Sequence, residues 1–182
     1  KTVIPFFKRF VGKIPNIKKL AKIEEKKLLK LWEGLGYYSR AKNLRKSAKL
    51  ILKNKNCLLP DNITELKKLP GIGEYTSRAI LALEFNIKTI PIDANIERLI
   101  KRVLLLKKNH ELEKKNLITK SNFFGYSYRQ RDYVQALMEL GALVCKPIDP
   151  LCGNCPISDK CKSFKNSDFK IIKKSKKNKI KY

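Results

Sequence analysis

Apolar residues recur along the chain at intervals of three and four positions, the spacing that places them on one face of an α-helix. The clearest such stretch covers residues 38–54, whose opposite face is basic. Its predicted apolar face consists of Ala41, Leu44, Ala48, Ile51 and Leu52. The same spacing predicts further helices over residues 2–11, 16–23, 24–32, 62–69, 74–85, 95–106 and 132–145.

Two stretches fall outside this helical pattern. Residues 88–92 are the only candidate for a short extended segment. Residues 107–125 are polar and irregular, so we expect a variable connection there. Signals for β-strands are thus nearly absent from the sequence.

A tight turn separates two of the predicted helices, with the sequence Leu69-Pro70-Gly71-Ile72-Gly73. Proline lacks an N–H and restricts the residue before it, so Pro70 should end the first helix. Gly71 and Gly73 allow positive φ and let a partner's backbone come close. The free N–H groups that open the next helix would bind an anion such as a DNA phosphate. A turn of this kind also serves simply to connect helices.

An acidic residue, Asp93, directly precedes the predicted helix over residues 95–106. Aspartate is a preferred N-cap, so the simplest interpretation is a structural one. The same position also presents a carboxylate at the mouth of a helix, downstream of the glycine turn. The sequence alone leaves both interpretations open.

The composition adds a strong charge imbalance. The chain has 182 residues, of which 43% are hydrophobic, which suffices for one domain or a domain with a small appendage. Lys and Arg number 42 against 16 Asp and Glu, for a net charge of +26. Such a surface attracts polyanions, although a bias toward lysine accounts for part of the excess.

No stretch of the sequence indicates a membrane or secretion signal. No apolar run approaches the ~18 residues that span a bilayer, and no signal peptide is visible. We therefore expect a cytoplasmic, nucleoid-associated protein. The chain begins at Lys1 in what resembles the middle of a helix, so a fragment is expected. The basic tail, residues 162–182, is expected to be disordered.

Four of the five cysteines form a compact run, with the spacing C-x6-C-x2-C-x5-C. Four thiolates brought together in this way can hold a tetrahedral metal ion or an iron–sulfur cluster. Disulfides are typical of small secreted domains and fit this chain poorly. Zinc remains the main alternative, although zinc sites mostly use two close pairs. The members of the run are Cys145, Cys152, Cys155 and Cys161, whereas Cys57 stands alone and is expected to be a buried or incidental thiol.

Together, the glycine turn, Asp93 and the cysteine run resemble the helix-hairpin-helix DNA glycosylases that carry a [4Fe-4S] cluster. Residues 31–41 (Leu-Trp-Glu-Gly-Leu-Gly-Tyr-Tyr-Ser-Arg-Ala) and 135–142 (Gln-Ala-Leu-Met-Glu-Leu-Gly-Ala) are similar to the adenine DNA glycosylase (MutY) family within this group. The resemblance implies an all-α fold with a helical barrel lobe and a cluster lobe that is built from both chain ends. It divides the chain into a helical core, a cluster loop and a tail, at 1–144 (hairpin 69–76), 145–161 and 162–182.

The resemblance also implies a reaction. The substrate would be double-stranded DNA with adenine opposite 8-oxoguanine or guanine, and the enzyme, expected to be a monomer, would hydrolyse the N-glycosidic bond of the flipped-out adenine. Asp93 corresponds to the catalytic aspartate that stabilises the positive charge on the sugar. Asn95 corresponds to a residue that helps to orient it. The four cysteines of the run would hold the [4Fe-4S] cluster.

Further positions follow from the same resemblance. Gln135 corresponds to a residue of the adenine pocket, although it could be an exposed helix position. Tyr37 corresponds to an aromatic wedge that unstacks DNA, although it could pack in the core beside Trp32. Arg40, Gly71, Ile72 and Gly73 are the remaining expected DNA contacts. Tyr75 lies where endonuclease III-like enzymes carry a Schiff-base lysine, so strand cleavage is not expected.

Two departures from the family pattern are visible. The family's general acid, a glutamate, would precede Lys1, and Glu74 lies where a basic residue is more usual. Two alternatives remain: a thymine or uracil mismatch glycosylase of the same superfamily, and a non-catalytic DNA-binding module that contains zinc.

Overall fold

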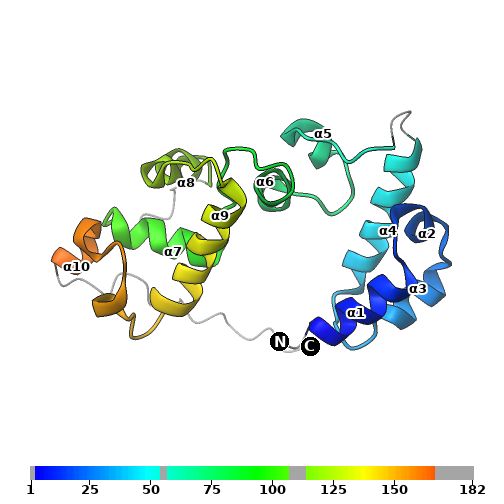
Figure 1. Ribbon diagram of the computed structural model, residues 1–182, viewed down its shortest axis with the longest axis horizontal. Coiled ribbons are helices and arrows are strands. Elements are labelled where there is room, and N and C mark those ends of the chain that lie inside the picture. The colour runs from blue at the N-terminus through cyan, green and yellow to red at the C-terminus, as the bar shows by residue number, and fades with distance from the viewer. Residues whose placement is uncertain (1–2, 54–56, 107–113, 167–182) are drawn as a thin grey trace, which may run out of the picture. The chain divides into compact units, whose positions relative to one another are not determined.

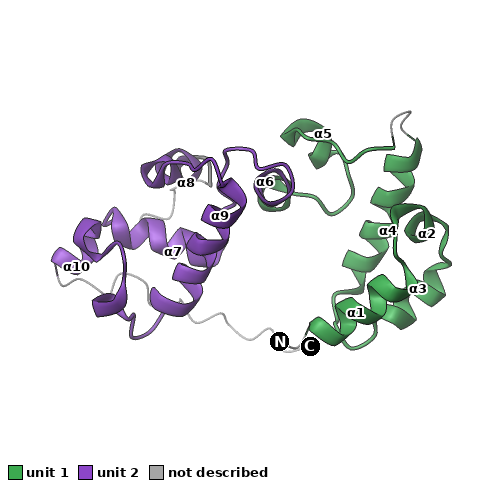
Figure 2. Cartoon of the chain, in the orientation of Figure 1, with its two compact units in different colours: residues 1–77 green, residues 78–182 purple. Residues whose placement is uncertain are grey.

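The computed structural model describes residues 3–53, 57–106 and 114–166, and every regular element within them is a helix (Figure 1). The expected all-α fold is therefore confirmed. The chain divides into two compact units, residues 1–77 and 78–182 (Figure 2). None of the described helices has the length and apolar character needed to cross a membrane.

Unit 1 contains five helices and the start of a sixth. They are α1 (Ile4–Lys13), α2 (Ile17–Lys22), α3 (Glu25–Trp32), α4 (Tyr38–Lys53), α5 (Ile63–Lys67) and α6 (Glu74–Leu83), which continues into unit 2. Asparagine side chains begin two of them: Asn16 Oδ1 accepts the N–H of Lys19, and Asn62 Oδ1 accepts the N–H of Glu65. Both helix starts agree with the sequence prediction.

Helix α4 packs against α2 and α3 to form the core of unit 1. The buried residues of this core are Ile14, Leu20, Ala21, Leu28, Ala41 and Ala48. Leu44, predicted on the buried face of α4, is 41% exposed, whereas Ser47 is buried. The predicted face was therefore wrong at Leu44, because α4 turns Ser47 inward to donate a hydrogen bond to Pro70 O at 3.0 Å.

Unit 2 is built around α7. Its elements are the rest of α6, α7 (Ala94–Val103), α8 (Lys114–Ser121), η1 (Asn122–Phe124), α9 (Gln130–Glu139), the π-helical turn η2 (Leu140–Val144), η3 (Cys152–Asn154), η4 (Ser158–Lys160) and α10 (Lys162–Lys165). Helix α7 contacts α8, α9, η2 and α10. The buried core consists of Ile90, Ile96, Leu99, Ile100, Val103, Leu117 and Leu137.

Three segments differ from the sequence prediction. Part of the connection expected to be irregular forms α8, because Leu117 is buried against α7, while residues 107–113 lie outside the described residues. Residues 88–92 form no strand. Helix α10 extends four residues into the expected tail and buries Ser163, while residues 167–182 lie outside the described part of the chain.

The cysteine run lies in unit 2, which consists of residues 78–182, whereas α1 belongs to unit 1 (Figure 2). The expected division at 1–144, 145–161 and 162–182 stays a prediction.

Gly141 allows η2 to approach the start of α7 closely. A Cβ at this position would lie 2.9 Å from Asn95 Cβ, which is closer than Cβ atoms approach other atoms in proteins, and 3.1 Å from Asn95 O, so Asn95 would have to shift. Because Gly141 lies against Asn95, this contact helps to place the Asn95 side chain. The π-helical turn itself is notable, since such turns are rare and often found at functional sites.

We predict that Gly141→Ala lowers the free energy of unfolding by about 1–3 kcal/mol, because the added methyl group overpacks this contact. Gly12→Ala in α1 is the control, since a Cβ there meets nothing within 4 Å. The control should be unchanged or stabilised by up to about 1 kcal/mol. Urea unfolding of both variants measures the difference, and equal stability would contradict the prediction.

Candidate functional site

The glycine turn of unit 1 joins α5 to α6. The N–H of Ile72 donates to Leu69 O at 3.1 Å, and the N–H of Ser77 donates to Gly73 O at 2.9 Å, which starts α6. Gly71 has a φ of +79°, and a Cβ there would lie 3.0 Å from Asn43 Cβ. Gly71 is therefore required by both conformation and space.

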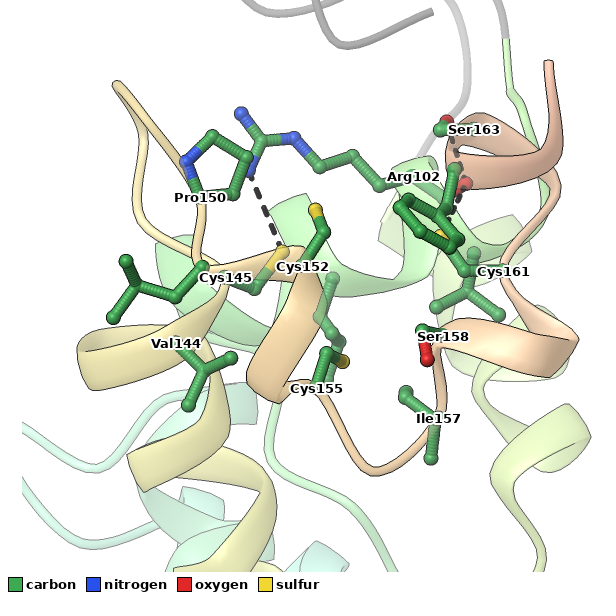
Figure 3. Close-up of a pocket in the computed structure, with 14 residues that line it drawn as sticks. Arg102, Val144, Cys145, Pro150, Cys152, Cys155, Ile157, Ser158, Cys161 and Ser163 are labelled. Carbon is green, nitrogen blue, oxygen red and sulfur yellow. Dashed lines mark hydrogen bonds between the residues drawn. The ribbon is translucent and has the colours of Figure 1, made fainter. Parts of the chain in front are cut away.

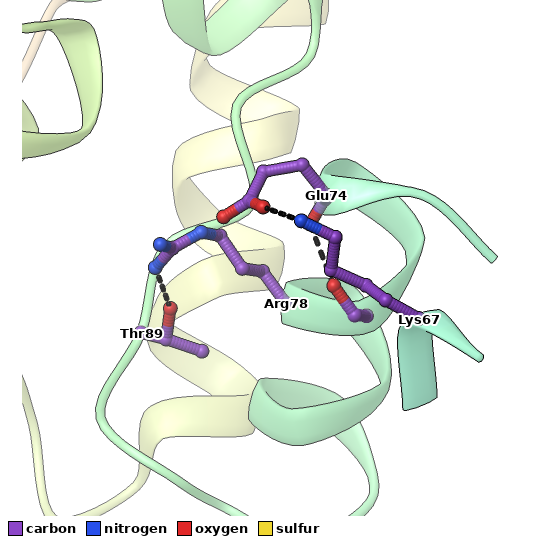
Figure 4. Close-up of polar contacts among 5 residues, drawn as sticks. Lys67, Glu74, Arg78 and Thr89 are labelled. Atoms are coloured by element: carbon purple, nitrogen blue, oxygen red, sulfur yellow. Dashed lines mark hydrogen bonds and ion pairs between the residues drawn. The ribbon is translucent and has the colours of Figure 1, made fainter. Parts of the chain in front are cut away.

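Gly73 has a different environment. Its φ is not positive, so Gly73 does not use the conformational freedom that glycine allows, and a Cβ there would meet nothing within 4 Å. The space in front of Gly73 is open within the described structure. The following residue, Glu74, is paired with Lys67, whose Nζ donates to Glu74 Oε2 at 2.9 Å (Figure 4). Part of the negative charge next to the turn is thereby offset.

Tyr37 projects from the loop between α3 and α4. Its ring is 74% exposed, its φ is +48°, and the Arg40 guanidinium lies 4.9 Å from the ring centroid. Trp32 instead packs against Phe10, and its Nε1 donates to Gly36 O at 3.0 Å. The alternative that Tyr37 packs in the core beside Trp32 was therefore wrong.

The strained loop that holds Tyr37 depends on glycines. Gly34 and Gly36 have φ values of +91° and +67°. A Cβ at Gly34 would lie 3.0 Å from the Phe6 ring, so this glycine also lets α1 approach. A non-glycine residue with positive φ, as at Tyr37, is uncommon and is often found at functional sites.

In unit 2, Asp93 is the N-cap of α7. Its Oδ1 accepts the N–H groups of Asn95 and Ile96 at 2.9 and 2.7 Å. The structural interpretation of Asp93 is thus confirmed. Capping occupies one oxygen only, and the second, Oδ2, accepts a hydrogen bond from Asn95 Nδ2 at 3.2 Å. The expected contact between Asn95 and Asp93 is therefore present.

Arg98 continues this network into the protein interior. It is 7% exposed, and its Nη2 donates to Asn95 Oδ1 at 2.9 Å while its Nε donates to Cys145 O at 2.8 Å. Its Nη2 also donates to Gly141 O. Burial lowers the pKa of Arg98, while Cys145 and Asp93 act in the opposite direction. Side chains thus connect the Asp93 carboxylate to the first cysteine of the run.

Sequence reasoning missed Arg98 and its neighbour Arg102, which are both buried. The available signal was their spacing of four residues on α7, which places them on one side of a helix rich in Leu99, Ile100 and Val103. Sequence reasoning also missed Gln130, which is fully buried and donates from Nε2 to Thr89 O at 2.8 Å. Thr89 in turn accepts from Arg78 Nη1 at 2.8 Å (Figure 4).

The four cysteines of the run line one pocket (Figure 3). All are free thiols and half-buried, so the disulfide alternative is excluded for them. Burial raises the pKa of Cys152 and of Cys155, and neighbouring cysteines add to the shift. The lone Cys57 is exposed rather than buried.

The four thiols supply donors that suit either a single ion or a cluster. One zinc ion bonds each thiolate at about 2.3 Å, whereas a four-iron cluster places one iron next to each thiolate. Within the described ranges, no three His, Cys, Asp or Glu side chains are arranged around a single metal position.

Two further expected residues lie on α9 and α6. Gln135 lies on α9 and is exposed, as the alternative interpretation had it. Tyr75 lies in the first turn of α6 and is 42% exposed. Ile72 is half-buried within the turn.

The comparison with known protein families now identifies the group. The description "HhH-GPD superfamily base excision DNA repair protein" matches residues 1–121. The chain belongs to this superfamily. The resemblance inferred from the motifs is thereby confirmed.

Relatives in this superfamily include adenine DNA glycosylases. That of Buchnera aphidicola subsp. Baizongia pistaciae is 38% identical over 179 residues, covering 97% of this chain and 51% of the relative. Those of Mus musculus and Homo sapiens are 34% and 32% identical, covering 90% and 89% of this chain and 32% and 30% of theirs. The chain thus spans about half the length of the bacterial relative and less of the others.

Solved structures confirm the helix-hairpin-helix glycosylase fold. A thermostable thymine-DNA glycosylase matches with a TM-score of 0.80 at 26% identity, over 90% of this chain and 76% of that chain. Endonuclease III in a trapped covalent intermediate with DNA matches with a TM-score of 0.75 at 22% identity, over 91% and 77%. The second likeness concerns the fold alone.

We predict that Asp93→Asn lowers the free energy of unfolding by less than Asp93→Ala does, because asparagine still caps the helix but its amide nitrogen cannot accept the hydrogen bond from Asn95 Nδ2. Asp93→Ala removes the acceptor for two N–H groups and should cost about 1 kcal/mol. Urea unfolding of the two variants checks this pair. A large loss of stability in Asp93→Asn would show that the negative charge itself holds the fold.

Proposed function

We propose that the protein is a monofunctional DNA glycosylase that hydrolyses the N-glycosidic bond of adenine opposite 8-oxoguanine or guanine. The observation that carries the proposal is the Asp93 carboxylate, which is held by the N-terminus of α7 and by Asn95 in a chain of this superfamily. Asp93 would stabilise the sugar cation that forms as the base leaves. Asn95 would fix the orientation of its second oxygen.

The DNA contacts would come from two loops of unit 1. The N–H groups of Gly71 and Gly73 would bind a phosphate, and the space in front of Gly73 permits its close approach. Tyr37, exposed and stacked on Arg40, would insert into the base stack beside the damaged guanine. Gln135 would contact the base in the pocket, and Tyr75, unlike a lysine, cannot form a Schiff base.

A [4Fe-4S] cluster is the proposed cofactor, held by Cys145, Cys152, Cys155 and Cys161. The residues fit it, because four cysteine side chains line one pocket, and four cysteines are the donor set that such a cluster takes. The buried Nε of Arg102, beside the pocket, has no hydrogen-bond partner among the described residues. When bound, the cluster supplies a fixed cross-link of the loop and a one-electron redox centre.

The test uses three DNA duplexes, which contain adenine opposite 8-oxoguanine, adenine opposite guanine and thymine opposite guanine. We predict that the protein, tested in its longest natural form, releases only adenine from these duplexes. The DNA strand should then break only after treatment with alkali. Asp93→Asn should lower the rate at least about 10²-fold, because the charge that stabilises the cation is lost. Gel analysis of end-labelled strands measures this.

The other outcomes decide between the alternatives. Release of thymine would favour a mismatch glycosylase similar to the thymine-DNA glycosylase whose structure matches at 26% identity. Strand breaks without alkali would contradict the role given to Tyr75. Colourless protein with stoichiometric zinc and no base release would favour a DNA-binding module.

A second prediction tests the phosphate contact separately from catalysis. Gly73→Asp places a favourable N-cap before α6, so stability should be kept, but its charge would repel a phosphate. We expect about tenfold weaker binding to duplex DNA and a reduced salt dependence. Gly12→Asp introduces the same charge on α1 without a clash and is the matched control. Fluorescence anisotropy at several salt concentrations measures the affinity of both variants for DNA. Equal affinities would refute the proposed phosphate contact at Gly73.

A further inference from the structure

Arg102 reaches into the cysteine pocket from α7 (Figure 3). It is 3% exposed, and its Nη1 donates to Cys145 Sγ at 3.4 Å. The same nitrogen donates to Lys146 O at 2.6 Å, and Nη2 donates to Pro147 O at 2.9 Å. The guanidinium is therefore fixed against the first cysteine of the run and the two residues that follow it.

The backbone of the same residue holds the other end of the run. Arg102 O accepts a hydrogen bond from Ser163 Oγ at 2.6 Å, and Cys161 Sγ lies 3.7 Å from the same oxygen. One residue thus contacts both the first and the last cysteine. These contacts are separate from the Asp93, Asn95 and Arg98 network, in which Arg98 donates to the carbonyl of Cys145.

The charge of Arg102 is buried without a carboxylate partner. Its acceptors in the described structure are carbonyl oxygens and one sulfur, and its Nε has no partner there. No carboxylate of the described residues pairs with it. A buried cation is costly unless a counter-charge is present. Ligating cysteines are thiolates, so the occupied site would provide that counter-charge.

We propose that Arg102 is a positioning residue that sets the reduction potential of the cluster through Cys145. The inference rests on the [4Fe-4S] cluster of the proposed function. Hydrogen bonds to ligand sulfur and nearby positive charge favour the more negative, reduced state of such a cluster, and so raise its potential. Because Arg102 donates to Cys145 alone among the sulfurs, its effect is concentrated at one ligand.

The experiment compares two substitutions at this residue. Arg102→Met removes the charge and the donors but keeps a long side chain, and Arg102→Lys keeps the charge while losing the paired donors. Lys101→Met, on the neighbouring residue that pairs with Glu97, is the matched control. Iron content and absorption spectra are recorded first, and the midpoint potential of the one-electron couple follows by voltammetry.

We expect Arg102→Met to retain iron and to shift the potential to more negative values. At a fixed potential the ratio of reduced to oxidised cluster should fall about tenfold, which corresponds to about 59 mV for one electron. Arg102→Lys should shift in the same direction by less, and Lys101→Met should match the wild type. Base release by the loaded variants is measured alongside, because the inference concerns the potential and not the chemistry at Asp93.

Two results would overturn the inference. An unchanged potential in iron-loaded Arg102→Met would show that the guanidinium does not act on the cluster. Loss of iron from both Arg102 variants would show that Arg102 holds the cysteine residues in place and does not set the reduction potential. Failure of the proposed cofactor is recognised separately, since the wild-type protein would then contain no iron, and the inference would fall with it.

Discussion

Two buried arginines on α7 hold the second unit together. The π-helical turn η2 ends at Val144, so carbonyl groups in its last turn and in the residues that follow lack the partners that a continuing helix would provide. Arg98 donates to Gly141 and Cys145, and Arg102 donates to Lys146 and Pro147. Buried carbonyl groups without donors cost free energy, so α7 supplies the missing hydrogen bonds from its side chains. The segment from Gly141 to Pro147, which contains the first cysteine of the run, is positioned by this arrangement.

The same arrangement links features that are distant in the sequence. Asp93 caps α7, Asn95 contacts Asp93 and Arg98, and Arg98 reaches Cys145. Gly141 permits this link, because a side chain there would displace Asn95. The residue proposed to stabilise the sugar cation and the residues proposed to hold the cluster are thus parts of one packed unit. Their orientation is set by packing and not by flexible loops.

Unit 1 uses glycine in two physically different ways. Gly71 and Gly34 are needed because the backbone and a neighbouring side chain leave no room for a Cβ. Gly73 has no positive φ and has room for a Cβ. Its open surroundings would allow the backbone or the phosphate of a partner to come close. The Ser47 hydrogen bond to Pro70 fixes the turn to α4, so the open site rests on a rigid support. The exposed ring of Tyr37 has a comparable support in its contact with Arg40.

The sequence by itself determined the helical fold, the caps at Asn16, Asn62 and Asp93, and the grouping of four cysteines, because these depend on local spacing and local hydrogen bonds. The superfamily could also be inferred from short motifs. Only the tertiary structure decided that Leu44 is exposed, that α8 exists, that Gly73 needs no positive φ, and that Arg98 and Arg102 are buried. Each of these depends on which neighbour packs against a helix, and periodicity along the chain carries no information about that neighbour. A basic residue on α7 therefore resembled a surface position until the carbonyl groups that surround it were known.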